Sequence, residues 1–218
     1  MIATADIAGK VRRLLNEAES DEQLSLLSED TRSIDEHIIA LLPQAVAMTQ
    51  RNKGEGCGCV NARSAGGESL PVADSGKECA VVSLPHDFVS LVSLQLEGWQ
   101  RPCTRLYSAG SAVAAAQNNP VLRAGVCRPV AVESVGNDGA RVALLYPSQG
   151  DAPRFRHFVY EAEFNADEGL DGCSNQLADA VAYNCAALLY SVFERPDAAN
   201  MFLSLAMALC NGNNIERR

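Results

Sequence analysis

The sequence lacks long apolar runs, since its apolar stretches last only a few residues. A membrane-spanning helix needs about 20 mostly apolar residues in a row, so no such helix is expected. The first residues, Met-Ile-Ala-Thr-Ala-Asp, carry an acid at Asp6 and lack the basic-then-apolar order of a secretory signal. We therefore expect a protein that is neither exported nor held in a membrane.

Positive charge is scarce. The chain has 18 Lys and Arg against 27 Asp and Glu, which gives a formal net charge of -9. Its densest basic groups are Arg12 with Arg13, Arg154 with Arg156, and Arg217 with Arg218. Proteins that bind nucleic acid usually present a continuous basic face that displaces phosphate counterions. Sequence-specific nucleic-acid binding is therefore not expected.

Histidine is scarce too, with three in 218 residues, and the eight cysteines are mostly single. Only Cys57 and Cys59 lie close together, and their one-residue spacing is too tight for the usual zinc pair. No phosphate-binding loop and no Gly-x-Ser-x-Gly elbow are present. We expect no metal, no cofactor and no catalytic residue. Without export, a disulfide framework is also not expected.

Apolar residues at helical spacing predict two helices within residues 1–50. The first has a stripe formed by Ile7, Val11, Leu14, Leu15 and Ala18. The second has a stripe formed by Ile34, Ile38, Leu41, Ala45 and Met48. Ser33 and Glu36 have the spacing of a capping box at its start, although Ser28 or Asp30 could also cap it. Pro43 is expected to kink or split this helix.

Residues 51–78 are rich in glycine and predict a loop with at most a short ordered piece. Residues 79–166 then predict a β-rich lobe. Its expected strands cover residues 79–84, 88–96, 129–133, 141–146 and 155–164. Gly136 to Gly139 predicts a hairpin between the third and fourth of these strands. A small alanine-rich helix is expected within residues 108–117.

The last third predicts a helical hairpin over residues 174–213, with Pro196 in the first turn of its second helix. The order is helices, strands, then helices. Because neither terminal pair can bury its stripe alone, we expect the two pairs to pack together. The predicted fold is a single α+β domain spanning residues 1–218. Its N- and C-terminal helices form a helical base, and a central antiparallel β lobe projects from it.

Four residues of the lobe are candidates for an interface with a partner: His86, Phe88, Trp99 and Arg101. Trp99 is the only tryptophan, and tryptophan is enriched in the residues that dominate binding energy. The alternative is that its ring packs into the lobe's own core. His86 follows Pro85 at a strand boundary, where an exposed turn residue is the alternative to a catalytic base.

Several segments resemble the head-to-tail connector, or adaptor, proteins of bacteriophages. Residues 10–17 and 35–46 are similar to the opening helices of that family, and residues 182–189 and 198–209 resemble its closing helical hairpin. Leu84-Pro85-His86-Asp87-Phe88 resembles the Leu-Pro-x-Asp-Phe entry into a strand. Ser90 stands where an arginine is expected after this motif, and the insertion at 51–78 also departs from the family pattern.

The resemblance implies a ring-forming structural protein without catalytic residues. Its copies would form a homo-oligomer that docks on portal or tail proteins of a phage or prophage virion. The protein would then reside in the virion, and otherwise in the cytoplasm. Negative charge would suit a channel through which DNA slides without adhering.

Two other functions remain open from the residues alone. A small thiol-dependent enzyme would need a cysteine of lowered pKa near a base. A ligand-binding module would need a pocket between the lobe and the helices. A single fast-reacting thiol would favour the enzyme, and a ligand retained through purification would favour the binding module.

Overall fold

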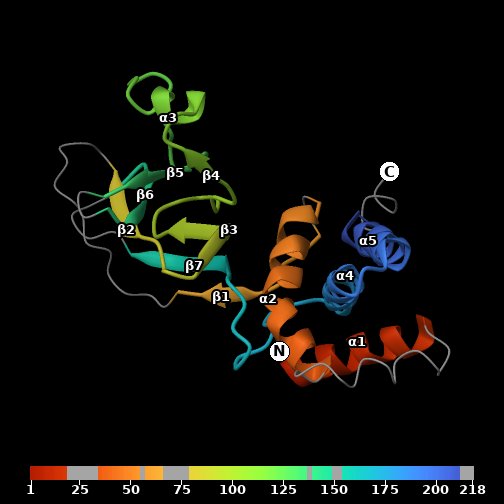
Figure 1. The fold of residues 1–218 in the computed structure, drawn as a ribbon. Coiled ribbons are helices and arrows are strands. Elements are labelled where there is room, and N and C mark those ends of the chain that lie inside the picture. The colour runs from red at the N-terminus through yellow and green to blue at the C-terminus, as the bar shows by residue number, and fades with distance from the viewer. Residues whose placement is uncertain (19–33, 55–56, 66–78, 137–138, 149–153, 212–218) are drawn as a thin grey trace. The chain divides into compact units, whose positions relative to one another are not determined.

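The computed structural model describes residues 1–18, 34–54, 57–65, 79–136, 139–148 and 154–211 (Figure 1). The chain is a mixed α+β protein that divides into two compact units. Unit 1 combines residues 1–62 with residues 163–218, and unit 2 comprises residues 63–162. The expectation that the chain forms a single domain stays a prediction.

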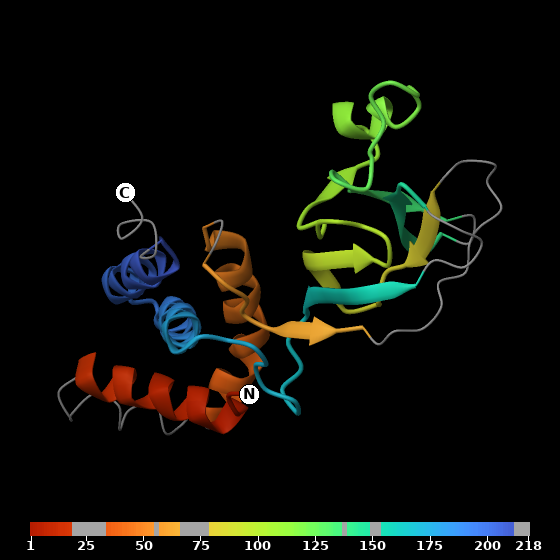
Figure 2. The same cartoon turned by 180° about the vertical axis from the view of Figure 1, so that it is seen from behind.

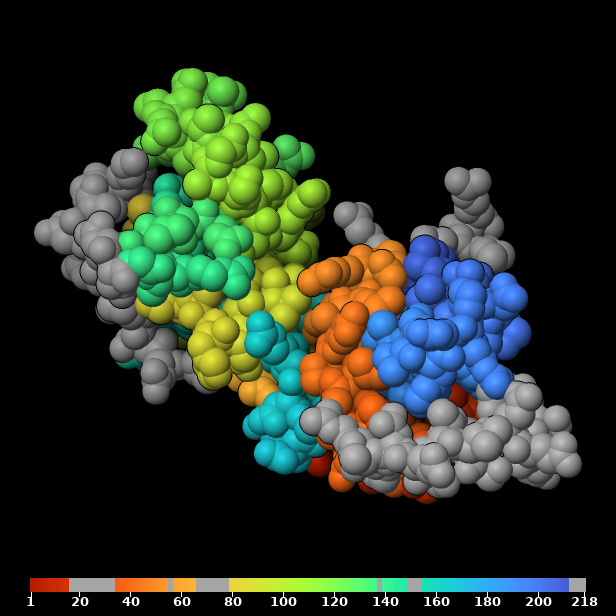
Figure 3. Space-filling model, viewed as in Figure 1, coloured from red at the N-terminus to blue at the C-terminus, as the bar shows by residue number. Residues whose placement is uncertain are grey.

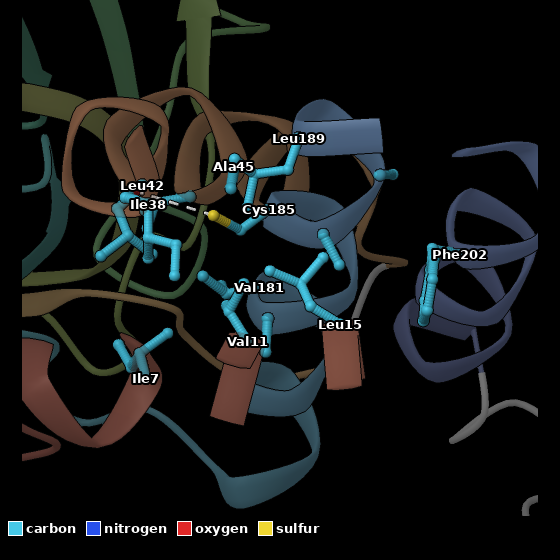
Figure 4. Close-up of a cluster of buried hydrophobic side chains, with 14 of the residues drawn as sticks. Ile7, Val11, Leu15, Ile38, Leu42, Ala45, Val181, Cys185, Leu189 and Phe202 are labelled. Atoms are coloured by element: carbon cyan, nitrogen blue, oxygen red, sulfur yellow. Dashed lines mark hydrogen bonds between the residues drawn. The ribbon is translucent and has the colours of Figure 1, made fainter. Parts of the chain in front are cut away.

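Unit 1 contains four helices drawn from both ends of the chain. They are α1 (Thr4–Ala18), α2 (Ile34–Asn52), α4 (Asn175–Val192) and α5 (Pro196–Asn211). The predicted apolar stripes meet in one buried cluster, in which Ile7, Val11 and Leu15 of α1 lie against residues of α2 and α4 (Figure 4). Among the described helices, none is long and apolar enough to cross a membrane.

Helix α4 packs against α1, α2 and α5, and alanines form part of its buried surface. Ala178, Ala182 and Ala186 are fully buried, and such small side chains allow neighbouring helices to approach closely. Ser174 caps the helix by accepting a hydrogen bond from the Leu177 amide at 3.2 Å. The Cys185 thiol points at the Ile38 carbonyl of α2, at 3.8 Å.

Pro43 does not split α2, which runs unbroken from Ile34 to Asn52. The proline is exposed, so its ring faces away from the buried cluster. The expected cap at Ser33 lies outside the described residues. Near the end of α2, the buried Asn184 amide of α4 donates to the Thr49 hydroxyl at 2.9 Å.

Unit 2 contains two small sheets. The three-stranded sheet has the order β1 (Ala62–Ser64), β7 (Phe155–Ala162), β3 (Phe88–Leu96). The four-stranded sheet has the order β2 (Ala80–Ser83), β6 (Arg141–Tyr146), β5 (Val130–Val135), β4 (Leu106–Ser108). Phe158 and Tyr160 of β7 belong to the same buried cluster as Phe88 of β3.

The prediction of an antiparallel lobe is wrong for one pair of strands. Strands β2, β6 and β5 are antiparallel neighbours, but β4 pairs with β5 in parallel. The sequence analysis did not predict β4, which is only three residues long. Parallel neighbours need a crossover connection, and residues 109–129 with helix α3 (Ala112–Ala116) provide it. Figures 1 and 2 both show this crossover standing clear of the two sheets.

Candidate functional site

Two of the four predicted interface residues lie in the core of unit 2. Phe88 and Trp99 are each 3% exposed and belong to the same buried cluster. The Trp99 indole donates to the Pro147 carbonyl at 2.9 Å, and the Gln95 amide donates to the Trp99 carbonyl at 2.8 Å. The tryptophan ring therefore packs into the core of its own unit, which was the alternative to an exposed interface residue. A partner could contact this ring only by opening the core.

The other two residues, His86 and Arg101, are exposed. His86 lies in the turn between β2 and β3, and Arg101 follows Trp99 in a loop. The four candidates are thus divided between a buried pair and an exposed pair. The exposed pair remains available to a partner.

The turn from Leu84 to Phe88 has a structural explanation centred on Asp87. This largely buried carboxylate accepts from the Arg63 guanidinium at 2.9 Å and from the Tyr160 hydroxyl at 3.2 Å. Burial, followed by the charge of Asp87, raises the pKa of the Tyr160 hydroxyl. These contacts join the turn to β1 and β7, so the aspartate of the motif fixes the entry into β3.

Phe88 completes this junction between the two sheets. Its ring stacks on Tyr160 with centroids 5.7 Å apart. The Arg141 guanidinium of β6 lies 5.4 Å from the Phe88 ring centroid and donates to the Phe88 carbonyl at 3.1 Å. The same guanidinium donates to Glu133 of β5 at 2.8 Å. The Leu84–Phe88 motif thus connects the two sheets of unit 2 through Asp87 and Phe88.

The most exposed large apolar side chain described in unit 2, Val121, lies on the crossover beside Leu122. We call residues 109–128 the projection; it stands out from unit 2 in Figure 3. Val121 is 88% exposed and Leu122 is 66% exposed. Behind them lies a hollow of about 770 Å³ bounded by α3 and by residues 121–128. Large apolar side chains at this level of exposure are typical of a surface that a partner covers.

Side-chain amides give the projection its shape. The Gln117 side chain donates to the Val113 carbonyl at 2.8 Å and accepts from the Ala124 amide at 2.9 Å. The Asn119 side chain accepts from the Val121 amide at 2.9 Å, which holds the apolar tip. The projection is therefore built by specific hydrogen bonds, although it has little regular secondary structure.

The charge around the projection differs from that of the whole chain. From Gly98 to Val132 the sequence has four arginines and no Asp, Glu or Lys. These are Arg101, Arg105, Arg123 and Arg128. Among the described residues, no ion pair involves Arg101, Arg105 or Arg128. These arginines are not adjacent in the sequence, so the signal that marks them is the absence of acids over a long stretch.

Three buried cysteines and one Ser–His pair bear on catalytic potential. Burial raises the pKa of Cys185 to about 12 and also raises the pKa values of Cys103 and Cys210. A thiol nucleophile needs a lowered pKa. The Ser93 hydroxyl lies 2.7 Å from the His157 ring, but no described contact places a carboxylate on that ring. No group of three or more His, Cys, Asp or Glu able to hold a metal occurs within the described ranges.

A comparison with models of known protein families and with curated proteins found no match for this chain.

Proposed function

We propose that the protein is a non-enzymatic structural protein that assembles into a ring and acts as an adaptor between the portal and the tail of a phage or prophage virion. The projection is the observation that carries this proposal. It combines exposed apolar side chains with arginines and excludes acids and lysine. Protein interfaces are enriched in arginine and depleted in lysine and acids in this way.

A ring needs a contact that repeats between unlike surfaces, because a head-to-tail interface closes only when each copy presents two different patches. In this proposal the helices of unit 1 are the base, and unit 2 is the lobe whose projection meets a neighbour. The partners are further copies of the chain together with portal or tail proteins, and the protein resides in the virion. The resemblance at residues 10–17, 35–46, 84–93, 182–189 and 198–209 supports this assignment.

Unit 2 carries nine acids and nine basic residues, whereas unit 1 carries eighteen acids and nine basic residues. The negative charge of the base suits a protein near passing DNA, since like charge repels phosphate. Sequence-specific DNA binding has no place in the proposal.

The raised pKa values of Cys103, Cys185 and Cys210 weigh against the thiol-dependent alternative. Cys127 is the one exposed cysteine of the eight, and its thiol donates to the Gln100 side chain at 3.2 Å. Alkylation at neutral pH should therefore show ordinary exposed-thiol reactivity at Cys127. A site that reacts much faster than a free thiol would favour the enzyme.

The test is mass in solution over a wide concentration range, with electron micrographs of the same samples. We expect a concentration-dependent rise in mass that ends in closed rings or short stacks of rings. The double variant Val121→Asp with Leu122→Asp should stay smaller at every concentration, because it places charge on the apolar tip. Val135→Asp is the matched control, since Val135 is exposed on β5 outside the projection. A wild-type chain that stays monomeric throughout would contradict the proposal.

A further inference from the structure

Beyond its first turn, helix α5 has an exposed face without charge, on which apolar side chains lie beside Asn200 and Ser204. Ala199, Phe202, Ala206 and Cys210 bury one side of the helix within unit 1. On the other side Met201, Leu205 and Met207 are between 42% and 50% exposed. No charged residue occurs from Ala198 to Asn211. A surface helix normally carries charged residues on its outer face, so this face is typical of one that another protein covers.

Acidic residues mark the N-terminal end of this face. Glu194 and Asp197 are exposed, and no ion pair between described residues involves either carboxylate. Asp197 lies one helical turn before Met201, which places it on the same side of α5. The α5 face therefore runs from an acidic end along an apolar stripe, within a unit that has twice as many acids as basic residues.

The projection is complementary to the α5 face in its exposed apolar side chains and in its charge. Val121 and Leu122 offer an exposed apolar pair, and Arg128 is an exposed cation a few residues further along the chain. An arginine opposite Asp197 would neutralise the acidic end, while the apolar pair would cover the exposed side chains of α5. The projection is positively charged and the end of the α5 face is negatively charged. Opposite charges of this kind steer association and suppress wrong pairings.

We propose that the projection of one copy docks on the α5 face of the next copy, with Val121 and Leu122 against Met201 and Leu205 and with Arg128 toward Asp197. The inference rests on the proposed self-assembly and names the two surfaces that perform it. Because every copy carries both patches, the contact is heterologous and repeats from copy to copy. Closure of a ring then depends on the rotation between successive copies.

Two double variants separate the two halves of the contact. Val121→Asp with Leu122→Asp disables the projection, and Met201→Asp with Leu205→Asp disables the α5 face. Each should weaken self-association by about tenfold or more, since central apolar contacts dominate interface energy. Val135→Asp and Ile39→Asp are matched controls, because each places an acid at an exposed apolar residue outside both patches. Circular dichroism and Trp99 fluorescence check that every variant is folded.

Mixing the two double variants is the sharpest measurement. Each variant retains the patch that the other has lost, so an equimolar mixture should form a one-to-one dimer and nothing larger. Sedimentation velocity resolves a dimer from monomers and from rings. A mixture that stays monomeric shows that the two patches do not pair, which overturns the inference. Assembly of either double variant at the wild-type concentration overturns it as well.

Charge reversal tests the polar end of the contact. Arg128→Glu and Asp197→Arg should each weaken association, and the two together in one chain should restore most of it. Restoration supports the pairing, and an additive loss overturns it. The outcomes also separate this inference from the proposed function. Rings that persist in the Met201→Asp with Leu205→Asp variant, but not in the Val121→Asp with Leu122→Asp variant, would remove the α5 contact and leave the ring adaptor intact. A wild-type chain that never self-associates removes both.

Discussion

Asp87 connects three parts of unit 2 through one carboxylate. We expect Asp87→Ala to lower the free energy of unfolding by about 2–4 kcal/mol, because it removes the carboxylate that accepts from a partly buried arginine and from a buried tyrosine hydroxyl. Chemical denaturation followed by Trp99 fluorescence measures the loss. His86→Ala is the matched control, since this neighbouring side chain is exposed and should change stability by less than about 0.5 kcal/mol. Equal effects of the two substitutions would show that the carboxylate is not the anchor.

Tyr146 makes the free energy of unfolding depend on pH in the alkaline range. Burial and the adjacent Cys79 raise the pKa of its hydroxyl from 10.0 to about 12 in the folded chain. As the pH rises, the hydroxyl of the unfolded chain loses its proton before that of the folded chain. The stabilisation that Tyr146 gives the folded chain is therefore complete below pH 10.0 and is lost as the pH rises to about 12. We expect the free energy of unfolding to fall over this window, and Tyr146→Phe to make the fall shallower. An identical pH profile for the variant would argue against this role of Tyr146.

At the scale of single elements, helix α2 contains a proline, Pro43, that is not needed for the helix to form. Pro43 lies inside the helix, is exposed, and deprives the Ile39 carbonyl of its helical donor. We expect Pro43→Ala to raise the free energy of unfolding by about 1–3 kcal/mol. Thermal denaturation followed by the helical signal measures the gain, with Gln44→Ala as the neighbouring exposed control. A loss of stability would mean that the proline favours the native geometry of α2.

The sequence predicts elements well where their periodicity is strong. The bounds of β3 and β6 match the expected ranges, and the four long helices of unit 1 lie where their apolar stripes indicate. Strands β1 and β4 were not predicted, because three residues show no alternation and each strand forms only by pairing with a neighbour. The parallel pairing of β4 with β5 follows from the crossover, which local patterns do not reveal.

The candidate interface shows the same limit. A lone tryptophan does not reveal which way its ring points, and Trp99 turns into the core. The projection lies in a stretch whose composition, without a single acid, was available in the sequence. Its importance depends on the exposure of Val121 and Leu122, and exposure follows from tertiary structure alone.

On the scale of the whole molecule, the two units have separate hydrophobic cores. The buried cluster of unit 1 and the buried cluster of unit 2 share no residue. Each unit also has its own spectroscopic probe. The long helices α1, α2, α4 and α5 belong to unit 1, while Trp99, the only tryptophan, belongs to unit 2. Far-ultraviolet circular dichroism therefore reports mainly on unit 1, and tryptophan fluorescence reports on unit 2.

We expect the two probes to give two distinct unfolding transitions. Leu189→Ala and Leu145→Ala form a matched pair, because both leucines are fully buried, one in each core. Each substitution should cost about 2–5 kcal/mol within its own unit. The first should shift the helical transition and leave the fluorescence transition in place, and the second should do the reverse. If either substitution shifts both curves together, the chain unfolds as the single cooperative domain that its sequence predicts.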